Sequence, residues 1–499
     1  MTSPARSDLI VVGAGAAGLY AALTAAEAGA TVTLISAMPL AESASFWAQG
    51  GLSVALAADD SPAIHLEDTL NAGRGAGRAA AARVLCAEAN LVLRDLTSLG
   101  VAWDRDRHGR PALGLEGGHS RRRIVHAGGA ATGRRITRAL SARAAESRLI
   151  TVLEGTRVDS LLSDGSCCRG VHLADGSSLL SNSVILATGG AAAMWKRTSN
   201  PLGTVGRGMV VAHAAGAALA DLEMVQFHPT ALADGSDRDG MLITEAIRGE
   251  GATLVDADGQ RFVDELAPRD EVALAIHQRM LDTEADSVAM DMRGVDPKLF
   301  PNVVQSLAEC GIDSTSELVP VAPAAHYVMG GIETDLYGQS TLPGLFAIGE
   351  TACTGLHGAN RLASNSLTEC FVFGRRAALT SLDTQAPSPT ASVSEVICDG
   401  PIRPSPETRD ALWTSAGLVR DRTGLEQLLG DPHPLARLVA VSALTREESR
   451  GAHRRSDFMT TDPLLDGQRS SISPDGACTM VPWDAFDSNS EVPAPAQLL

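Results

Sequence analysis

Two short segments of the chain place charged side chains where they could serve acid–base chemistry or bind a charged substrate. TEAIRGE (244–250) sets Glu245 and Arg248 three residues apart, which brings the two side chains together on one helical turn. LEGGHS (115–120) sets one carboxylate, Glu116, beside two glycines and directly ahead of the basic run RRRIVH. A lone carboxylate in a basic segment is a candidate partner for a cationic substrate group, and a solvated surface charge is the alternative.

Side chains that could bind carboxylates recur in several further segments. These are QFHPTAL (226–232), LITEAIRGEGA (242–252), APRDEVA (267–273), AAHYVMGGI (324–332) and GLHGANRLASNSLTEC (355–370). Histidine, threonine and arginine side chains together suit a small dicarboxylate, because each carboxylate then meets a donor or a cation. Any one of these residues alone is more often a surface or satisfied core residue, so only the set favours a site.

A glycine-rich turn near the N-terminus predicts a dinucleotide site. GAGAAG (13–18) lies between two apolar stretches, and its spacing allows a tight turn and close approach of the backbone to a pyrophosphate. The second stretch ends at Ser36 instead of the acidic residue that would hold the ribose of NAD. Two later apolar strands, ILATGG (185–190) and TLPGLFAIGE (341–350), resemble FAD-contacting stretches of two-dinucleotide-fold flavoproteins. We therefore expect FAD at a parallel sheet to which the chain returns late.

The composition indicates a globular protein of several domains. A length of 499 residues is consistent with about three domains, and a net charge of −18 disfavours a nucleic-acid partner or an anionic membrane surface. The eight cysteines show no CxxC pair and no zinc-like grouping, which predicts reduced thiols and no metal site. No stretch reaches the roughly 18 apolar residues of a membrane span, and the first residues lack the features of a secretory signal. We expect a cytoplasmic protein.

The segment FWAQGG (46–51) and the carboxylate-binding segments above occur in the order of a known family. From about residue 8 to 376 the chain resembles the flavoproteins that include succinate dehydrogenases, fumarate reductases and L-aspartate oxidases. The resemblance implies an α/β fold in which a Rossmann-like FAD-binding domain carries an inserted α+β capping domain and is followed by a C-terminal helical domain.

The expected domain boundaries follow from that resemblance and from a linker rich in Pro and Ser at 383–408. Beyond the linker we expect two or three amphipathic helices, and we expect the tail from about residue 470 to be poorly ordered. The predicted ranges are 1–219 and 327–385 for a discontinuous FAD-binding domain, 220–326 for the capping domain and 404–499 for the C-terminal domain with its flexible tail.

The resemblance also implies the roles of individual residues. Arg269 is the residue nearest the chemistry, and Glu245 with Arg248 forms a proton path to it; a plain ion-pair cluster is the alternative. The implied substrate-binding residues are Gln226, His228, Thr244, His326 and Arg361. The implied FAD-binding residues are Gly13, Ala14, Gly15, Ala16, Ala17, Gly18, Ser36, Ser43, Ala44, Ser45, Ala48, Gln49, Gly50, Gly51, Val158, Thr188, Gly189, Glu350, Asn365, Ser366 and Leu367.

Three features distinguish branches of this family. Succinate dehydrogenases carry an apolar residue where this chain has Glu116, and the ammonium of aspartate, which succinate lacks, needs a carboxylate partner once it is desolvated. The carboxylate would also repel a bare dicarboxylate. Membrane-bound succinate dehydrogenases bind FAD covalently through a histidine five residues before the Gln of AQGG, where this chain has Ala44, so we expect non-covalent FAD. RGAHRRSDF (450–458) resembles the arginine-rich helical region of the aspartate-oxidising branch.

One residue departs from the family pattern. After NPLGTVG (200–206) the family usually has an Asp that contacts FAD, and this chain has Arg207. A cation in place of an anion could weaken or reorganise FAD binding.

The implied function is FAD-dependent oxidation of L-aspartate to iminoaspartate, with oxygen or fumarate as electron acceptor. In the family this is the first step of de novo NAD biosynthesis, and the product passes to quinolinate synthase, with which a transient contact is expected. The alternatives are a soluble fumarate reductase or succinate-oxidising flavoprotein, and a flavin-binding protein without catalysis, which only Arg207 favours.

Overall fold

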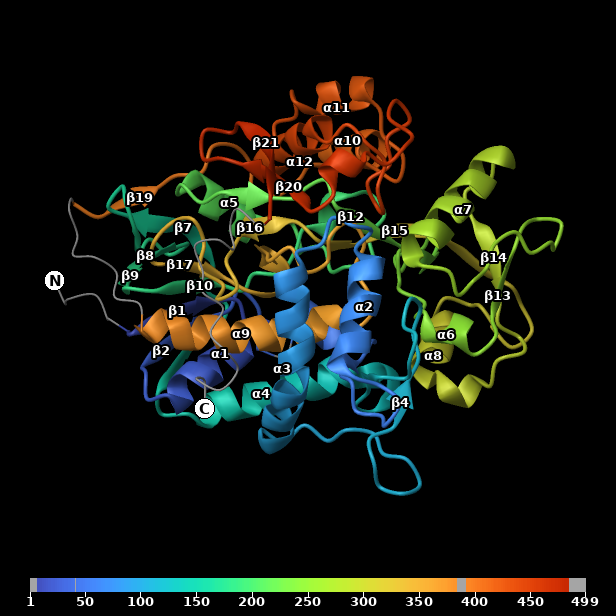
Figure 1. Ribbon diagram of the computed structural model, residues 1–499, viewed down its shortest axis with the longest axis horizontal. Coiled ribbons are helices and arrows are strands. Elements are labelled where there is room, and N and C mark those ends of the chain that lie inside the picture. Colours follow the sequence, from blue (N-terminus) through green and yellow to red (C-terminus); the bar gives the residue numbers. More distant parts are fainter. Residues whose placement is uncertain (1–6, 41, 384–391, 484–499) are drawn as a thin grey trace.

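The core of the protein is a five-stranded parallel sheet, seen in a computed structural model that describes residues 7–40, 42–383 and 392–483 (Figure 1). The sheet order is β17-β10-β1-β2-β6. Its strands are β1 (Leu9–Val12), β2 (Val32–Ile35), β6 (Ile150–Leu153), β10 (Val184–Leu186) and β17 (Leu345–Ala347). Four of these strands are buried on both faces, as a parallel sheet requires, and the edge strand β6 is partly exposed. The late return of the chain to this sheet is confirmed.

Helices cover one face of this sheet and an antiparallel sheet covers the other. Leu9, Val11 and Leu34 share a core with the helices, whereas Ile10 and Val12 share a core with the antiparallel sheet. The helices are α1 (Ala16–Glu27), α3 (Ala79–Ser98), α4 (Thr132–Glu146) and α9 (Asn365–Asp383). The antiparallel strands are β7 (Val158–Ser163), β8 (Cys168–Leu173), β9 (Ser178–Leu180) and β19 (Ser394–Val396), with α5 (Arg207–Ala214) beside them.

A second α+β unit lies to the right in Figure 1, where the sequence predicts the capping domain. Its antiparallel sheet has the order β12-β15-β14-β13 and its own hydrophobic core. The elements are β12 (Val225–Leu232), α6 (Ala246–Gly249), β13 (Thr253–Val255), α7 (Arg269–Asp282), β14 (Val288–Asp291), α8 (Pro301–Glu309) and β15 (Val319–Val328). The fold class predicted from the sequence is confirmed, and the domain boundaries remain predictions.

The C-terminal region lies above the central sheet in Figure 1 and contains helices and a hairpin. The helices are α10 (Pro406–Ser415), α11 (Arg422–Leu428) and α12 (Pro434–Thr445), and the hairpin joins β20 (Gln468–Ile472) to β21 (Cys478–Pro482). The expectation of disorder from about residue 470 is wrong up to residue 483, because β20 pairs with β11 (Leu219–Ala220) and Trp483 is buried. The rest of that tail and part of the predicted linker lie outside the described residues. The segment 450–458 is not helical: it forms turns and isolated bridges.

Short elements complete the frame of the site. A three-stranded sheet, β3 (Leu52–Ser53), β5 (Ile124–Val125) and β4 (Leu113–Gly114), leads directly into the segment of Glu116, and α2 (Pro62–Ala72) ends nearby. The strands β16 (Gly331–Glu333) and β18 (Ala352–Cys353) join the sheet of β11 and β20.

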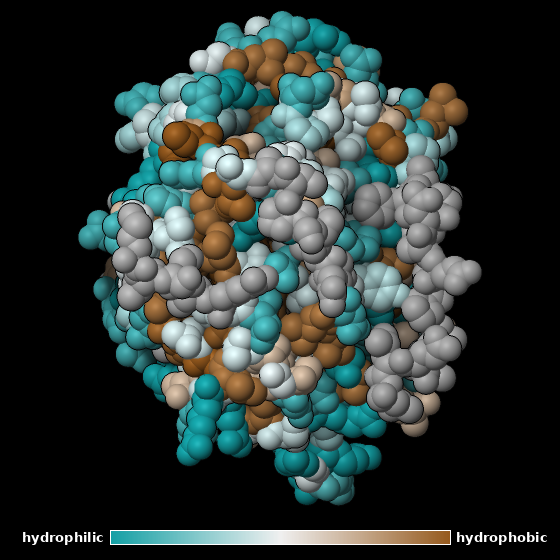
Figure 2. Space-filling view, turned by 90° about the vertical axis from the view of Figure 1, so that its left-hand side faces the viewer, coloured by the Kyte–Doolittle hydropathy of each residue, from teal (hydrophilic) through white to brown (hydrophobic). Residues whose placement is uncertain are grey.

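The surface carries hydrophobic residues in separate patches among hydrophilic ones on the face shown in Figure 2. Within the described ranges, every helix is too short or too polar to cross a membrane. Each of the eight cysteines is a free thiol, as the sequence predicts.

Candidate active site

The glycine-rich turn between β1 and α1 is shaped for a nucleotide. Gly13 has φ +109°, and a Cβ there would collide with the carbonyl oxygen of Ala187, while a Cβ at Gly18 would collide with that of Gly13. Gly15 is the N-cap of α1 and has no side chain to cap the helix. These glycines therefore let the backbone at the start of α1 come close to a pyrophosphate.

Other predicted FAD residues lie at the same edge of the sheet. The strands β1, β10 and β17 are parallel, and their carboxyl ends lead into Gly13, Thr188 and Glu350 respectively. Thr351 Oγ1 donates to the carbonyl of Gly189 at 3.0 Å, which ties the last two ends together. Dinucleotides bind at this edge of such sheets, so the residues present fit FAD.

The segment 43–51 contains buried polar atoms without a hydrogen-bond partner among the described residues. These are Ser43 Oγ and Gln49 Oε1. Ser45 Oγ accepts from the amide of Ala16 at 3.1 Å, which fixes this segment over the start of α1. Buried orphan atoms are rare in native proteins, and a bound cofactor would satisfy them.

The pKa of Glu350 is raised to about 7 by burial, with the amide of Val328 donating to its Oε1 at 3.1 Å. A Cβ at Gly190 would collide with this carboxyl group. The Glu350 carboxyl group therefore lies between Gly190 and strand β15, at the edge of the sheet where FAD is expected.

Four other predicted FAD residues make contacts within the protein. The Asn365 amide bonds to Ser53, His65 and Thr69, and Ser366 Oγ accepts from Arg361 at 2.8 Å. Leu367 packs in the main core, and the side chain of Ser36 donates to the carbonyl of Met38. Their contacts to FAD remain predictions.

Arg207 turns to the antiparallel sheet. Its Nε donates to the carbonyl of Val158 at 2.8 Å and its Nη2 pairs with Asp159 Oδ1 at 2.5 Å. Asp159 Oδ1 also lies 2.9 Å from Arg157 Nε, so two guanidinium groups share this carboxylate. The effect of Arg207 on FAD binding remains a prediction. Val158 was itself predicted to contact FAD, and that contact remains a prediction.

Two histidines and a glutamine face one another across strands β12 and β15. The rings of His228 and His326 lie 5.2 Å apart, with His326 Nδ1 2.8 Å from Ser199 Oγ. Burial, aided by nearby arginine charges, holds the pKa of both histidines well below the usual range, so both are neutral near pH 7. Gln226 Oε1 accepts from Arg269 at 3.2 Å and from Arg361 at 3.3 Å. The glutamine thus links the two guanidinium groups.

Arg361 is fixed by an aromatic face as well as by hydrogen bonds. Its guanidinium carbon lies 4.6 Å from the ring centroid of Tyr327, whose hydroxyl donates to Glu369 Oε2 at 2.9 Å. His357 Nε2 lies 2.7 Å from the same oxygen. Burial lowers the pKa of Arg361 to about 10, so the cation persists at neutral pH. Tyr327 and Glu369 lie in the segments AAHYVMGGI and GLHGANRLASNSLTEC, but no local pattern in the sequence predicts their role.

The three charged side chains of the predicted proton path contact one another in the structure. Arg269 Nε lies 2.7 Å from Glu245 Oε2, and Arg248 Nη2 lies 3.4 Å from Glu245 Oε1. Burial acts to raise the pKa of Glu245, but the charges of Arg269 and Arg248 lower it on balance. Thr244 precedes this pair and is buried. The three charged side chains form a continuous buried chain, and their role as a proton path remains a prediction.

Glu116 is a buried, ionised carboxylate at the edge of this cluster. It is 8% exposed, Ser364 Oγ donates to its Oε2 at 2.6 Å, and His126 Nε2 lies 3.7 Å from its Oε1. Burial acts to raise its pKa, but contacts with His126 and Ser364 and the charge of Arg269 lower it to about 2. The surface-charge alternative is excluded by this burial. The sequence predicts no role for Ser364 or His126, although both lie in quoted segments, because their contact with Glu116 depends on the fold.

Ser364 also connects Glu116 to the cofactor edge. Its Oγ accepts from the amide of Gly51 at 3.1 Å, and Ser364 itself has φ +61°. A Cβ at Gly50 would lie 3.8 Å from Glu116 Oε1. The carboxylate is therefore held between the AQGG segment and the segment of Arg361.

A cavity of about 130 Å³ opens beside these groups. This volume has room for several water molecules and therefore for a small organic acid. Its lining residues include Gly117, Gly118, Arg269 and Arg361.

Comparison with known proteins agrees with this geometry. Residues 8–367 match the FAD binding domain family, and residues 429–466 match the fumarate reductase flavoprotein C-terminal family. The chain is 42% identical to the L-aspartate oxidase of Caulobacter vibrioides, covering 94% of this chain and 96% of that protein. It is 43% identical to that of Mesorhizobium japonicum, with coverages of 91% and 92%.

Among solved structures, the quinol fumarate reductase FrdA of E. coli, in a mutated form, superposes with a TM-score of 0.85 at 28% identity and covers 96% of both chains. FAD as cofactor, predicted from the sequence, is confirmed by the family match. The chain belongs to the L-aspartate oxidase family of FAD-binding flavoproteins.

Proposed function

We propose that this protein oxidises L-aspartate to iminoaspartate with FAD as cofactor, and that oxygen or fumarate takes up the electrons. The observation that carries the proposal is Glu116, a buried and ionised carboxylate inside a site otherwise built to bind anions. An ammonium group is the substrate feature that such a carboxylate fits.

The charge balance of the site supports an amino dicarboxylate. Arg248, Arg269 and Arg361 supply three cations, and Glu116 and Glu245 supply two anions, while the two histidines are neutral. These five charged side chains together carry one net positive charge. Aspartate has two carboxylates and one ammonium, so its net charge of minus one balances the site. Succinate would leave an excess negative charge next to Glu116.

The geometry suggests how the residues divide the work. Arg361, His228, Thr244 and His326 bind the carboxylates, and Glu116 binds the ammonium. FAD, when bound, supplies the acceptor for the hydride that leaves C2 of aspartate. Loss of one amine proton completes the two-electron oxidation.

Arg269 serves as the residue that holds or moves a proton beside the reacting carbon. Its bond to Glu245, and the contact of Glu245 with Arg248, give that proton a buried route. When fumarate is the electron acceptor, the proton moves in the opposite direction along this route. Fumarate then accepts a hydride and a proton to become succinate, and the route supplies the proton.

The test is hydrogen peroxide release by FAD-loaded protein given L-aspartate, with D-aspartate, L-glutamate and succinate in parallel. Peroxide from L-aspartate alone supports the proposal. Turnover of succinate without turnover of aspartate would refute it and favour the alternative of a succinate-oxidising flavoprotein.

The proposal extends to the cofactor linkage and to partners. Ala44 begins a short 3₁₀ turn and offers no side-chain atom for a bond to flavin, which supports non-covalent FAD. The product is an imine that water hydrolyses, so the proposal includes a transient contact with quinolinate synthase in the cytoplasm, as the family relationship implies. Comigration of the two purified proteins during turnover, set against either alone, tests this contact.

A further inference from the structure

Helix α7 begins with two residues that have different partners. Arg269 contacts Glu245 and Gln226 in the site, as described above. Asp270 follows it directly, and its side chain is fully buried. A single peptide bond therefore joins the arginine of the site to a buried carboxylate that no role in the reaction requires.

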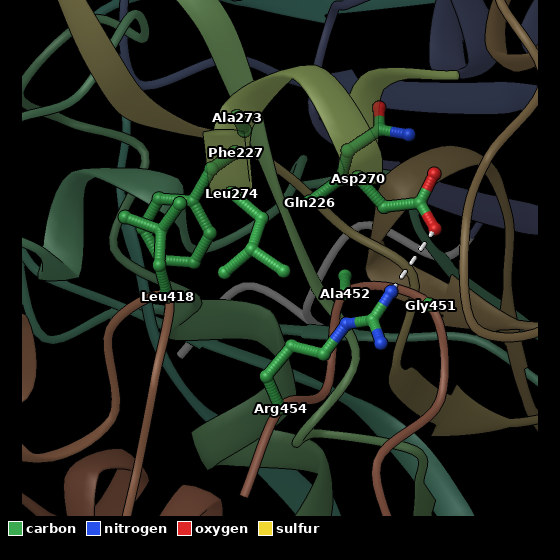
Figure 3. Close-up of a pocket in the computed structure, with 9 residues that line it drawn as sticks. All are labelled: Gln226, Phe227, Asp270, Ala273, Leu274, Leu418, Gly451, Ala452 and Arg454. Atoms are coloured by element: carbon green, nitrogen blue, oxygen red, sulfur yellow. Dashed lines mark ion pairs between the residues drawn. The ribbon is translucent and has the colours of Figure 1, made fainter. Parts of the chain in front are cut away.

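Asp270 binds two arginines from distant parts of the chain. Arg74, just after α2, donates from Nε and Nη2 to the two carboxylate oxygens at 3.1 Å each. Arg454, in the C-terminal region, places Nη2 3.8 Å from Oδ2 (Figure 3). Asp270 therefore joins the capping unit to the other two parts of the molecule at one point.

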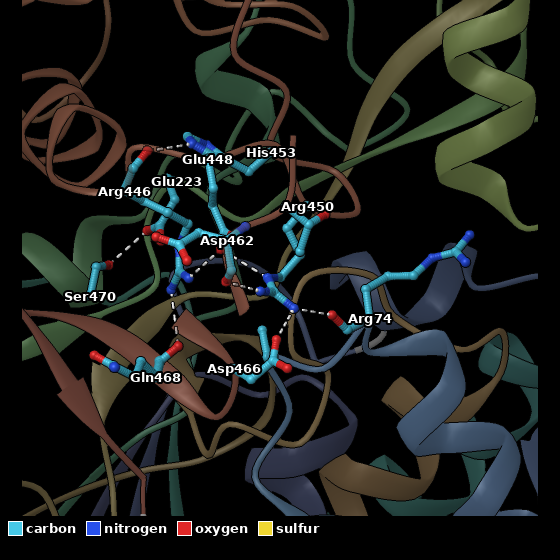
Figure 4. Close-up of polar contacts among 12 residues, drawn as sticks. Arg74, Glu223, Arg446, Glu448, Arg450, His453, Asp462, Asp466, Gln468 and Ser470 are labelled. Atoms are coloured by element: carbon cyan, nitrogen blue, oxygen red, sulfur yellow. Dashed lines mark hydrogen bonds and ion pairs between the residues drawn. The ribbon is translucent and has the colours of Figure 1, made fainter. Parts of the chain in front are cut away.

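Arg74 is itself held rigidly. It has φ +54°, which residues with a side chain adopt rarely and only when the surroundings enforce it. Arg450 Nη1 donates to its carbonyl at 2.6 Å, and Arg450 Nε binds Glu448 at 2.8 Å. Glu448 lies 3.1 Å from Arg446, which binds Glu223 at 2.6 Å just ahead of β12 (Figure 4). One buried network thus anchors both Arg74 and the strand that carries Gln226.

Apolar packing alone does not seal the contact between α7 and the C-terminal region. A cavity of about 20 Å³, lined by residues that include Leu274 and Leu418, lies between them and has room for about one water molecule. Arg454 Nε is buried there without a hydrogen-bond partner among the described residues. The ion pair of Arg454 with Asp270 therefore connects α7 to the C-terminal region at a place where side chains leave a small cavity between them.

We infer that Asp270 is a positioning residue for Arg269. It acts through its ion pairs with Arg74 and Arg454, which together are called the joint below. The joint fixes the first turn of α7, and this keeps the Arg269 guanidinium within reach of Glu245 and of the substrate. The inference rests on the proposed function, in which Arg269 handles the proton. A displacement of about 1 Å at such a group can cost about a hundredfold in rate.

The test compares Asp270→Asn with Glu271→Gln in FAD-loaded protein. Glu271 pairs with the same Arg74, at 2.5 Å, but its side chain is 50% exposed, which makes it the matched control. Asp270→Asn should lower kcat per bound flavin with L-aspartate about tenfold to a hundredfold and change KM less than about threefold. Glu271→Gln should leave both within about twofold. Equal kcat values for the two variants would overturn the inference.

A second readout does not depend on turnover. Amide hydrogen exchange at residues 269–274 should accelerate about tenfold in Asp270→Asn relative to Glu271→Gln, with exchange in β1 and α1 unchanged. If the wild type fails to oxidise aspartate, the proposed function fails, and the exchange comparison still decides the role of Asp270. Arg454→Gln is the second variant should Asp270→Asn not fold; unchanged kcat and unchanged exchange in it would also refute the joint.

Discussion

Replacing Glu116 by Gln should separate amino-acid oxidation from fumarate reduction. The amide of Gln keeps the size of the side chain and removes its negative charge. The Glu116 carboxyl group is ionised at every working pH, because its pKa is about 2. The ammonium of bound aspartate then loses its charged partner in a site where the carboxylate is only 8% exposed. Breaking a buried ion pair costs about 3–5 kcal/mol. At about 1.4 kcal/mol per tenfold, kcat/KM for aspartate should fall by about a hundredfold to a thousandfold or more.

Fumarate has no ammonium and, like succinate, meets a repelling charge at Glu116, so the same change should leave its reduction unchanged or raise it by less than about fivefold. The assays are peroxide release with L-aspartate and oxidation of a chemically reduced dye by fumarate, both normalised to bound flavin. Glu250→Gln, an exposed glutamate at the end of α6, is the matched control and should affect neither. Equal losses in the two reactions would refute the ammonium-binding role and would point instead to a disturbed Ser364 or flavin edge.

Three further predictions concern the cofactor and the C-terminal network. Acid precipitation of the holoprotein should leave all flavin in the supernatant, because Ala44 cannot bond to it; flavin in the pellet would contradict this. Gly13→Ala should reduce bound flavin to less than about a tenth, because a Cβ at φ +109° meets the backbone at Ala187, and normal flavin content would show that the turn can yield. Burial and the charge of Arg420 hold the pKa of His453 well below its usual range, so its neutral form stabilises the fold above about pH 6.5 and this contribution is lost as the pH falls. Between pH 7.5 and 5.5 the free energy of unfolding should therefore drop about 1.4 kcal/mol more in the wild type than in His453→Gln, as measured by denaturant titration, and parallel pH dependences would exclude this role.

Local patterns predict those parts of the molecule in which neighbours in sequence are neighbours in space. The glycine turn at 13–18 predicts the nucleotide edge because β1, the turn and α1 form one continuous unit. Glu245 and Arg248 are close for the same reason, since one helical turn separates them. The prediction of a helix at 450–458 is wrong. Arg450 and Arg455 form buried hydrogen bonds and ion pairs with carbonyl and carboxylate groups, and these contacts hold the segment in turns.

The residues that escaped prediction act across long separations. Ser364 reaches Glu116 across 248 positions, and Arg74 reaches Asp270 across 196. No periodicity marks such pairs, because a serine or arginine in a loop has the same local signature whether it faces water or a buried carboxylate. Only the packing of the three units against one another makes these contacts.

The same long separations explain why one scaffold can serve different dicarboxylates. The guanidinium groups of Arg269 and Arg361 are fixed by Gln226 and Glu245, whose own positions depend on β12 and α6. Glu116 comes from a separate loop beyond β4, where Ser364 and His126 contact its carboxylate and the charges of Arg269 and Arg361 act on it. The next residue of this loop, Gly117, packs against Glu245, since a Cβ there would collide with Glu245 Oε1. A change at the Glu116 position can therefore add or remove an ammonium site while the carboxylate clamps and the proton path stay in place. On the proposed function, substrate choice is a local electrostatic property set at Glu116, because a substrate without an ammonium group leaves this buried charge without a partner.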